Sequence, residues 1–84
     1  MAALVTRSVF SPAYGHLREW LIAGRRDRQL TQVRLAALLG RPQSFVSKYE
    51  RGERRLDFVE VLEIAEVLGI DACDLVQEVR RALT

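Results

Sequence analysis

Residues 31–52 have the sequence TQVRLAALLGRPQSFVSKYERG, and the expected architecture follows from this stretch. Thr31 is a favourable N-cap, and Gly40 is suited to end a helix because glycine tolerates a left-handed backbone. A second helix is expected over about Pro42–Arg51, where Gly52 stops it in the same way. The stretch therefore predicts two short helices joined by a connection of about three residues.

The apolar residues of this stretch lie where two crossing helices would touch. Four positions must be apolar if the helices pack across each other, and all four are: Leu35, Leu39, Val46 and Tyr49. Ala36 lies at the closest approach, where a small side chain is needed, and Gly40 permits the sharp turn. Because these requirements are independent of one another, we interpret the stretch as a helix-turn-helix.

A further helix is expected before this unit. It begins at Pro12 after the N-cap Ser11 and fades near Asp27. Four residues at helical spacing form its apolar face: Tyr14, Leu17, Leu21 and Gly24.

Two more helices are expected after Gly52. Asp57 caps the fourth, Glu60 completes a capping box three residues later, and Gly69 ends the helix. Asp71 caps the fifth. The apolar faces are Val61, Leu62, Ala65 and Leu68 in the fourth helix, and Leu75, Val79 and Leu83 in the fifth. Because no segment alternates apolar and polar residues as strands do, we expect one all-α domain of five helices.

The motif also resembles a known family. LTQVRLAALLG at residues 30–40 is similar to the second helix of the Cro and phage-repressor-type (Xre-like) helix-turn-helix family. PQSFVSKYERGER at residues 42–54 is similar to its recognition helix and the following turn, and the resemblance extends over about residues 17–76. It implies a five-helix, lambda-repressor-like bundle that binds operator DNA, usually as a two-fold dimer. The chain departs from the family at two positions. The family often has Ser or Thr where this chain has Pro42, and Glu where it has Arg34, so two side-chain capping groups are missing.

The composition of the chain limits the classes of function that the protein can have. Residues 1–56 hold eleven Lys and Arg against four Asp and Glu, whereas residues 57–84 hold two against seven, which suggests one face for a polyanion. Cys73 and His16 are single, so neither a disulfide nor a metal site is expected, and Cys73 should be a buried or half-buried apolar residue. No apolar run approaches the roughly 20 residues of a membrane span. Because no set of residues in the sequence suggests a catalytic site, we expect no enzymatic activity, no cofactor and no membrane partner. We expect a cytoplasmic, nucleoid-associated protein.

Base contacts are expected from the first turn of the recognition helix. Gln43 and Ser44 open this helix, and Lys48 lies one turn further on the same exposed face. Glutamine can pair bidentately with adenine, serine with any base, and lysine with guanine or a phosphate. Phe45 leaves two interpretations open, because its ring could touch a thymine methyl group or pack against the preceding helix.

Phosphate contacts are expected around these positions. The resemblance implies that Gln32 binds a phosphate at the start of its helix, and that Arg25 and Glu50 form a partly buried ion pair. Ser47 is small enough for a close approach to a phosphate. The other candidates are arginines that flank the recognition helix: Arg41, Arg51, Arg54 and Arg55.

Two functions of different kinds fit these residues. The first is a sequence-specific transcriptional regulator, a repressor, that binds a palindromic operator as a homodimer. The alternative is the antitoxin of a toxin–antitoxin pair, which binds a toxin protein as well as DNA. A module that had lost DNA binding would lack the basic cluster and the polar recognition face, and both are present in this sequence. No small-molecule effector is expected.

The division of the chain follows from this interpretation. Residues 1–10 are expected to be an N-terminal arm, and residues 11–84 a DNA-binding domain that ends in a dimerisation helix. Two recognition helices must lie about 34 Å apart to contact one face of DNA, so the interface must lie away from the basic face. The expected interface residues are Val76, Val79 and Leu83, with Val9 and Phe10 packing across them.

Overall fold

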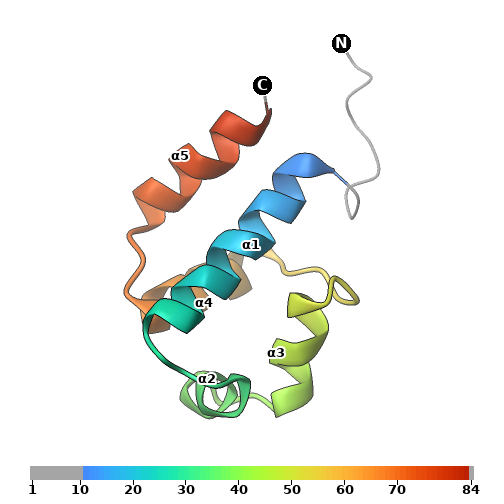
Figure 1. The fold of residues 1–84 in the computed structure, drawn as a ribbon, viewed down its shortest axis with the longest axis vertical. Coiled ribbons are helices and arrows are strands. Elements are labelled where there is room, and N and C mark those ends of the chain that lie inside the picture. The colour runs from blue at the N-terminus through green and yellow to red at the C-terminus, as the bar shows by residue number, and fades with distance from the viewer. Residues whose placement is uncertain (1–10, 84) are drawn as a thin grey trace.

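The computed structural model describes residues 11–83, which form five α-helices (Figure 1). These are α1 (Pro12–Asp27), α2 (Gln32–Leu39), α3 (Gln43–Glu50), α4 (Phe58–Leu68) and α5 (Ala72–Leu83). No strand occurs between residues 11 and 83, so the predicted all-α, five-helix architecture is confirmed. The predicted N-terminal arm, with Val9 and Phe10, lies outside the described residues.

The helices begin where the sequence supplies side-chain caps. The hydroxyls of Ser11 and Thr31 each accept the backbone N–H three residues later at 3.0 Å. Asp57 accepts the N–H of Glu60 at 2.7 Å, and the Glu60 side chain accepts the N–H of Asp57 at 3.0 Å, which completes the capping box. Only Pro42, the N-cap of α3, offers no side-chain acceptor among the four caps recorded for α1 to α4.

The core lies where α1 and α4 pack on the motif formed by α2 and α3. Its five largest fully buried side chains are Leu21, Leu35, Val46, Tyr49 and Ile64. Ala36 is only 2% exposed, as its place between α2 and α3 requires. Gly24 of α1 also lies at a close approach, because a β-carbon there would lie 2.8 Å from Cδ1 of Ile70 and the end of that side chain would have to shift.

The helices are arranged around α1. It packs against α3, α4 and α5, while α2 packs against α3 and α4. Figure 1 places α2 and α3 at one end of the molecule, and α5 beside α1 at the other. The exposed surfaces of α3 and α5 therefore lie on separate parts of the molecule. No helix within residues 11–83 is long and apolar enough to cross a membrane.

Two side chains depart from the sequence prediction. Leu62, expected on the apolar face of α4, is 37% exposed, and Ile64 occupies the core position with 1% exposure. Helical spacing indicates the direction of an apolar face but not its width, and Leu62 lies at its edge. Cys73 was expected to be buried or half-buried but is exposed. The buried residue of α5 is Leu75.

Candidate nucleic-acid interface

The turn between α2 and α3 consists of Gly40, Arg41 and Pro42. Gly40 has a φ of +68°, in the left-handed region that favours glycine. The backbone N–H groups of Gly40 and Arg41 donate to the carbonyl oxygens of Ala37 at 3.1 Å and Ala36 at 2.9 Å. The turn thus satisfies the last carbonyl groups of α2 and fixes the direction in which α3 leaves it.

One face of α3 is polar and exposed. Gln43, Ser44 and Lys48 are all exposed on this face, while Ser47 is half-buried and its hydroxyl donates to the carbonyl of Ser44 at 3.4 Å. The opposite face is buried and comprises Phe45, Val46, Tyr49 and Glu50. Three of the four residues predicted to contact bases therefore share one accessible surface.

Phe45, for which a base contact and packing against the preceding helix were both open, is buried in the hydrophobic core. Its side chain is only 7% exposed, and its ring meets the Tyr49 ring edge-on at 5.5 Å between centroids. The guanidinium groups of Arg41 and Arg54 lie 4.4 and 4.9 Å from the ring centroid. The two guanidinium groups therefore cover part of the Phe45 ring.

A chain of hydrogen bonds runs from α1 to the first residue of α3. The Glu50 carboxylate accepts from Arg25 Nε at 2.7 Å and Nη2 at 3.0 Å. Gln32 Nε2 donates to Glu50 Oε1 at 2.8 Å, and Gln32 Oε1 accepts from Gln43 Nε2 at 3.2 Å. Since a carboxylate only accepts, Gln32 turns its nitrogen toward Glu50 and its oxygen toward Gln43. The amide of Gln43 is thereby oriented by Gln32.

The ion pair implied by the family resemblance is present and largely shielded from solvent. The side chains of Arg25 and Glu50 are 11% and 6% exposed. Hydrogen bonding to Glu50 raises the pKa of the Arg25 guanidinium, and Arg25 Nη1 also donates to the carbonyl of Leu30 at 2.7 Å. Burial raises the pKa of the neighbouring Tyr49 hydroxyl. The pair therefore holds α1 against α3.

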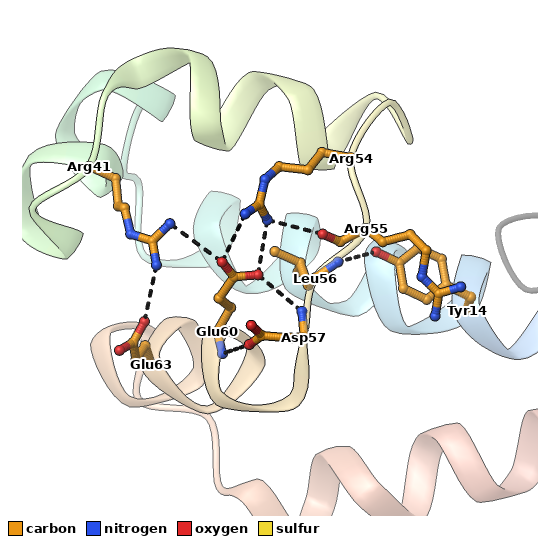
Figure 2. A network of polar contacts seen from close by, with 8 residues as sticks. All are labelled: Tyr14, Arg41, Arg54, Arg55, Leu56, Asp57, Glu60 and Glu63. Atoms are coloured by element: carbon orange, nitrogen blue, oxygen red, sulfur yellow. Dashed lines mark hydrogen bonds and ion pairs between the residues drawn. The ribbon is translucent and has the colours of Figure 1, made fainter.

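A second buried carboxylate, Glu60, binds two of the arginines predicted to contact phosphates (Figure 2). Arg54 is bidentate, with Nη1 2.9 Å from Oε1 and Nη2 3.0 Å from Oε2 of Glu60. Arg41 Nη1 lies 3.4 Å from Glu60 Oε2, and Arg41 Nη2 lies 3.7 Å from Glu63 Oε1. We call Arg41, Arg54, Glu60 and Glu63 the Glu60 network. Its two cations and two carboxylates cancel in formal charge, so the positive charge near α3 is smaller than the arginine count suggests.

The sequence identified Glu60 only as a helix cap. Arg54 and the N–H of Asp57 hydrogen-bond to the Glu60 side chain and lower the pKa of its carboxyl to about 2. A signal for the wider role existed, because a capping-box carboxylate points back toward the preceding loop, where Arg54 lies. The contact with Arg41 had no such signal, since it crosses 19 positions of sequence.

The remaining phosphate candidates lie around the end of α3. Arg51 pairs with Glu53 at 3.1 Å, and both side chains are more than half exposed. This pairing lowers the pKa of Glu53. The Arg55 guanidinium lies 4.9 Å from the centre of the Tyr14 ring, and the Tyr14 hydroxyl accepts the N–H of Leu56 at 3.0 Å. Sequence analysis had assigned Tyr14 to the apolar face alone.

Within residues 11–83, no group of three or more His, Cys, Asp or Glu residues could hold a metal ion. The polar side chains on the accessible face of α3 are instead the amide of Gln43, the hydroxyls of Ser44 and Ser47, and the ammonium group of Lys48. These are the groups that contact phosphates and base edges in DNA.

The fold and the exposed face of α3 define a helix-turn-helix protein, and comparison with known proteins agrees. The family model described as helix-turn-helix matches residues 21–75. The chain belongs to this family of DNA-binding proteins, of the Cro and repressor type, whose members are regulators and not enzymes.

Two relatives are informative. A protein of Sinorhizobium fredii, described as the uncharacterized HTH-type transcriptional regulator y4dJ, is 36% identical over 52 residues, which are 62% of this chain and 68% of that protein. The crystal structure of the clp gene regulator ClgR from Corynebacterium glutamicum has a TM-score of 0.71 at 21% identity. The match covers 84% of this chain and 76% of that one, so the two share a fold.

Proposed function

We propose that this protein is a transcriptional repressor that binds a palindromic operator as a homodimer. The observation that carries the proposal is the exposed face of α3, where Gln43, Ser44 and Lys48 project from a helix fixed by the turn before it. The related Sinorhizobium fredii protein is described as a transcriptional regulator, which supports a role of the same class here. A dimer bound over a promoter would exclude the polymerase.

The residues of the interface divide into two roles. Gln43 accepts and donates at an adenine edge, and Ser44 and Lys48 contact neighbouring base pairs. Gln32, Ser47, Arg51 and Arg55 lie around them and contact phosphates, together with Arg41 and Arg54 of the Glu60 network. The bond between Gln32 and Gln43 supports this division, because a phosphate-bound Gln32 would hold Gln43 in place.

The homodimer is supported by an apolar surface on α4 and α5. Val76 and Leu83 of α5 are 51% and 69% exposed, and Val79 is half-buried. Phe58 of α4 is 71% exposed beside them, and with Leu62 and Val76 it lines a cavity of about 300 Å³. Apolar side chains gathered in this way indicate a surface that a partner covers.

The charges of α5 favour a second copy as that partner. Asp71 and Asp74 lie at its N-terminal end, and Arg80 and Arg81 at its C-terminal end. An antiparallel pair of these helices would place each acidic end against the basic end of its partner. A two-fold axis produces this antiparallel arrangement.

Selection of binding sites from a random duplex library tests the proposal. The purified protein should enrich an inverted repeat whose half-site centres lie about 10 base pairs apart. A promoter carrying the enriched repeat should then be repressed when the protein is expressed. Failure to enrich any sequence would contradict the proposal, whereas enrichment only together with a co-purified toxin would favour the antitoxin alternative.

A further inference from the structure

We propose that Glu60 is a positioning residue for DNA binding, which holds the guanidinium groups of Arg41 and Arg54 together beside α3 so that both contact phosphates without leaving it. This inference rests on the proposed function, because it concerns the same DNA surface. Glu60 itself contacts no DNA. It acts through the two guanidinium groups that it binds.

The placement of the two arginines supports this role. Arg41 lies in the turn before α3 and Arg54 in the loop after it, and their guanidinium groups converge on the Glu60 carboxylate. Both guanidinium groups lie over the ring of Phe45, whose buried side chain belongs to α3 itself. Their positions are therefore set relative to α3 by the ring and relative to α4 by Glu60, which Figure 2 shows between the two guanidinium groups.

Glu60 is well suited to be the fixed point of this arrangement. It lies in the first turn of α4, and its own side chain is bound by the Asp57 N–H of the capping box at 3.0 Å. Arg54 is held by the bidentate contact and also donates from Nη1 to the carbonyl of Arg55 at 3.0 Å. A side chain restrained in this way loses little further freedom when a phosphate binds.

Both arginines retain capacity for a phosphate. Their side chains are 33% and 40% exposed for Arg41 and Arg54. A guanidinium has five N–H donors, and Arg54 uses three of them in the bonds above, which leaves two for other acceptors. Full transfer of the arginines to phosphates would instead leave the Glu60 carboxylate, only 8% exposed, without its cations, and that is strongly unfavourable.

The substitution Glu60→Gln separates positioning from simple charge. Glutamine also serves in a capping box, so the cap of α4 is retained. The loss of one negative charge beside DNA should by itself tighten binding. If Glu60 positions the arginines, affinity for the selected operator should fall by roughly tenfold instead, and the slope of log affinity against log salt should become shallower by about one unit for each phosphate that an arginine no longer neutralises.

Glu66→Gln is the matched control, because it removes the same charge further along α4 and outside the Glu60 network. Glu66 is exposed. This variant should bind DNA at least as tightly as the unmodified protein. A Glu60→Gln variant that binds as tightly as the Glu66→Gln variant would overturn the inference.

Arg54→Lys provides a second variant in case Glu60→Gln does not fold by circular dichroism. It keeps the charge but cannot make the planar, bidentate contact with Glu60. Its affinity should fall by a similar factor at equal net charge, and unchanged affinity would overturn the inference. If the unmodified protein binds no duplex at low salt, the proposed function itself fails, which is a distinct result from normal binding by these variants.

Discussion

At the scale of single residues, the two carboxylates that are buried within residues 11–83 bind three arginine side chains, those of Arg25, Arg41 and Arg54. Glu50 and Glu60 are each 8% exposed, and each is bound by arginine side chains and by another polar group. The Arg51–Glu53 pair differs, because both of its side chains are more than half exposed. Solvent weakens such a pair, whereas a buried carboxylate depends on its partner.

The Arg25–Glu50 pair should therefore be essential to the fold. Replacing Arg25 with Met leaves the buried carboxylate of Glu50 uncompensated, and the free energy of unfolding should fall by about 3–5 kcal/mol. Urea unfolding followed by circular dichroism measures the change. Glu53→Gln is the control and should leave the unfolding midpoint unchanged, and equal effects of the two variants would contradict this assignment.

Acid should release the Glu60 network in a defined pH range. The pKa of Glu60 is about 2, below its ordinary value of 4.5, so folding favours its charged form. Its contribution to stability is complete above about pH 4.5 and is lost as the pH falls toward about 2. Glu60→Gln should thus be less stable than the unmodified protein at neutral pH, and urea midpoints should converge below pH 4.5. A difference that stays constant down to pH 2 would argue against the pairing.

Substitutions at Gln43 and Arg51 should distinguish base contacts from phosphate contacts. Gln43→Ala should lose discrimination at one base position and weaken binding to the preferred site by about 1–3 kcal/mol. Arg51→Ala should weaken binding to all sequences alike and flatten the salt dependence by about one unit. Arg51 suits this comparison better than Arg54, because Arg54 also belongs to the Glu60 network. Identical sequence profiles for the two variants would refute the division of roles.

At the scale of elements, α3 differs from the helices around it in how it begins. Pro42 has the extended N-cap backbone, with φ −65° and ψ 153°, but no side-chain hydrogen bond. In α1, α2 and α4 the cap side chain accepts a backbone N–H of the first turn. Among α1 to α4, the helix proposed to contact DNA is thus the one that begins without a side-chain cap.

A serine at this position should stabilise α3. Pro42→Ser supplies the missing acceptor, and Pro42→Ala is the matched control, since both variants lose the rigidity of proline in the unfolded chain. The serine variant should be more stable than the alanine variant by about 1 kcal/mol. Thermal unfolding of both proteins measures the difference, and equal stability would mean that the first turn of α3 is satisfied in another way.

The elements could be predicted from the sequence because their signals are local. Ser11, Thr31, Asp57 and the two glycines that end α2 and α4 mark helix boundaries within a few residues of themselves. The surroundings of Phe45 could not be predicted, because its exposure depends on Arg41 and Arg54, whose positions depend in turn on a carboxylate in another helix. Helical spacing likewise could not fix the core position of Ile64 or the exposure of Cys73, since both depend on where neighbouring helices end.

At the scale of the whole molecule, the surface of α3 and the apolar surface of α5 lie on separate parts of the fold (Figure 1). A dimer formed through α5 would thus leave both copies of α3 accessible. Eleven of the thirteen Lys and Arg residues precede residue 57, and seven of the eleven Asp and Glu residues lie in residues 57–84, which matches this separation. DNA would meet the first surface and the partner copy the second.

Charge placed on the α5 surface should separate the dimer. A double variant with Val76→Asp and Leu83→Asp should sediment as a monomer at concentrations where the unmodified chain is a dimer, because both side chains are exposed in the single chain. Val33→Asp is the control, since Val33 is 64% exposed on α2, and it should remain a dimer. If the unmodified protein is itself a monomer and still binds a half-site tightly, the dimer is wrong.

The exposed thiol of Cys73 has a practical consequence for experiments on this protein. It is the single cysteine of the sequence, so a fluorescent or spin label can be attached at one defined atom without any substitution. Cys73 lines an apolar hollow with Phe58, Leu62 and Val76, beside the surface proposed for pairing. Alkylation of the thiol should consequently slow as protein concentration rises, and the reaction rate then serves as a built-in reporter of association.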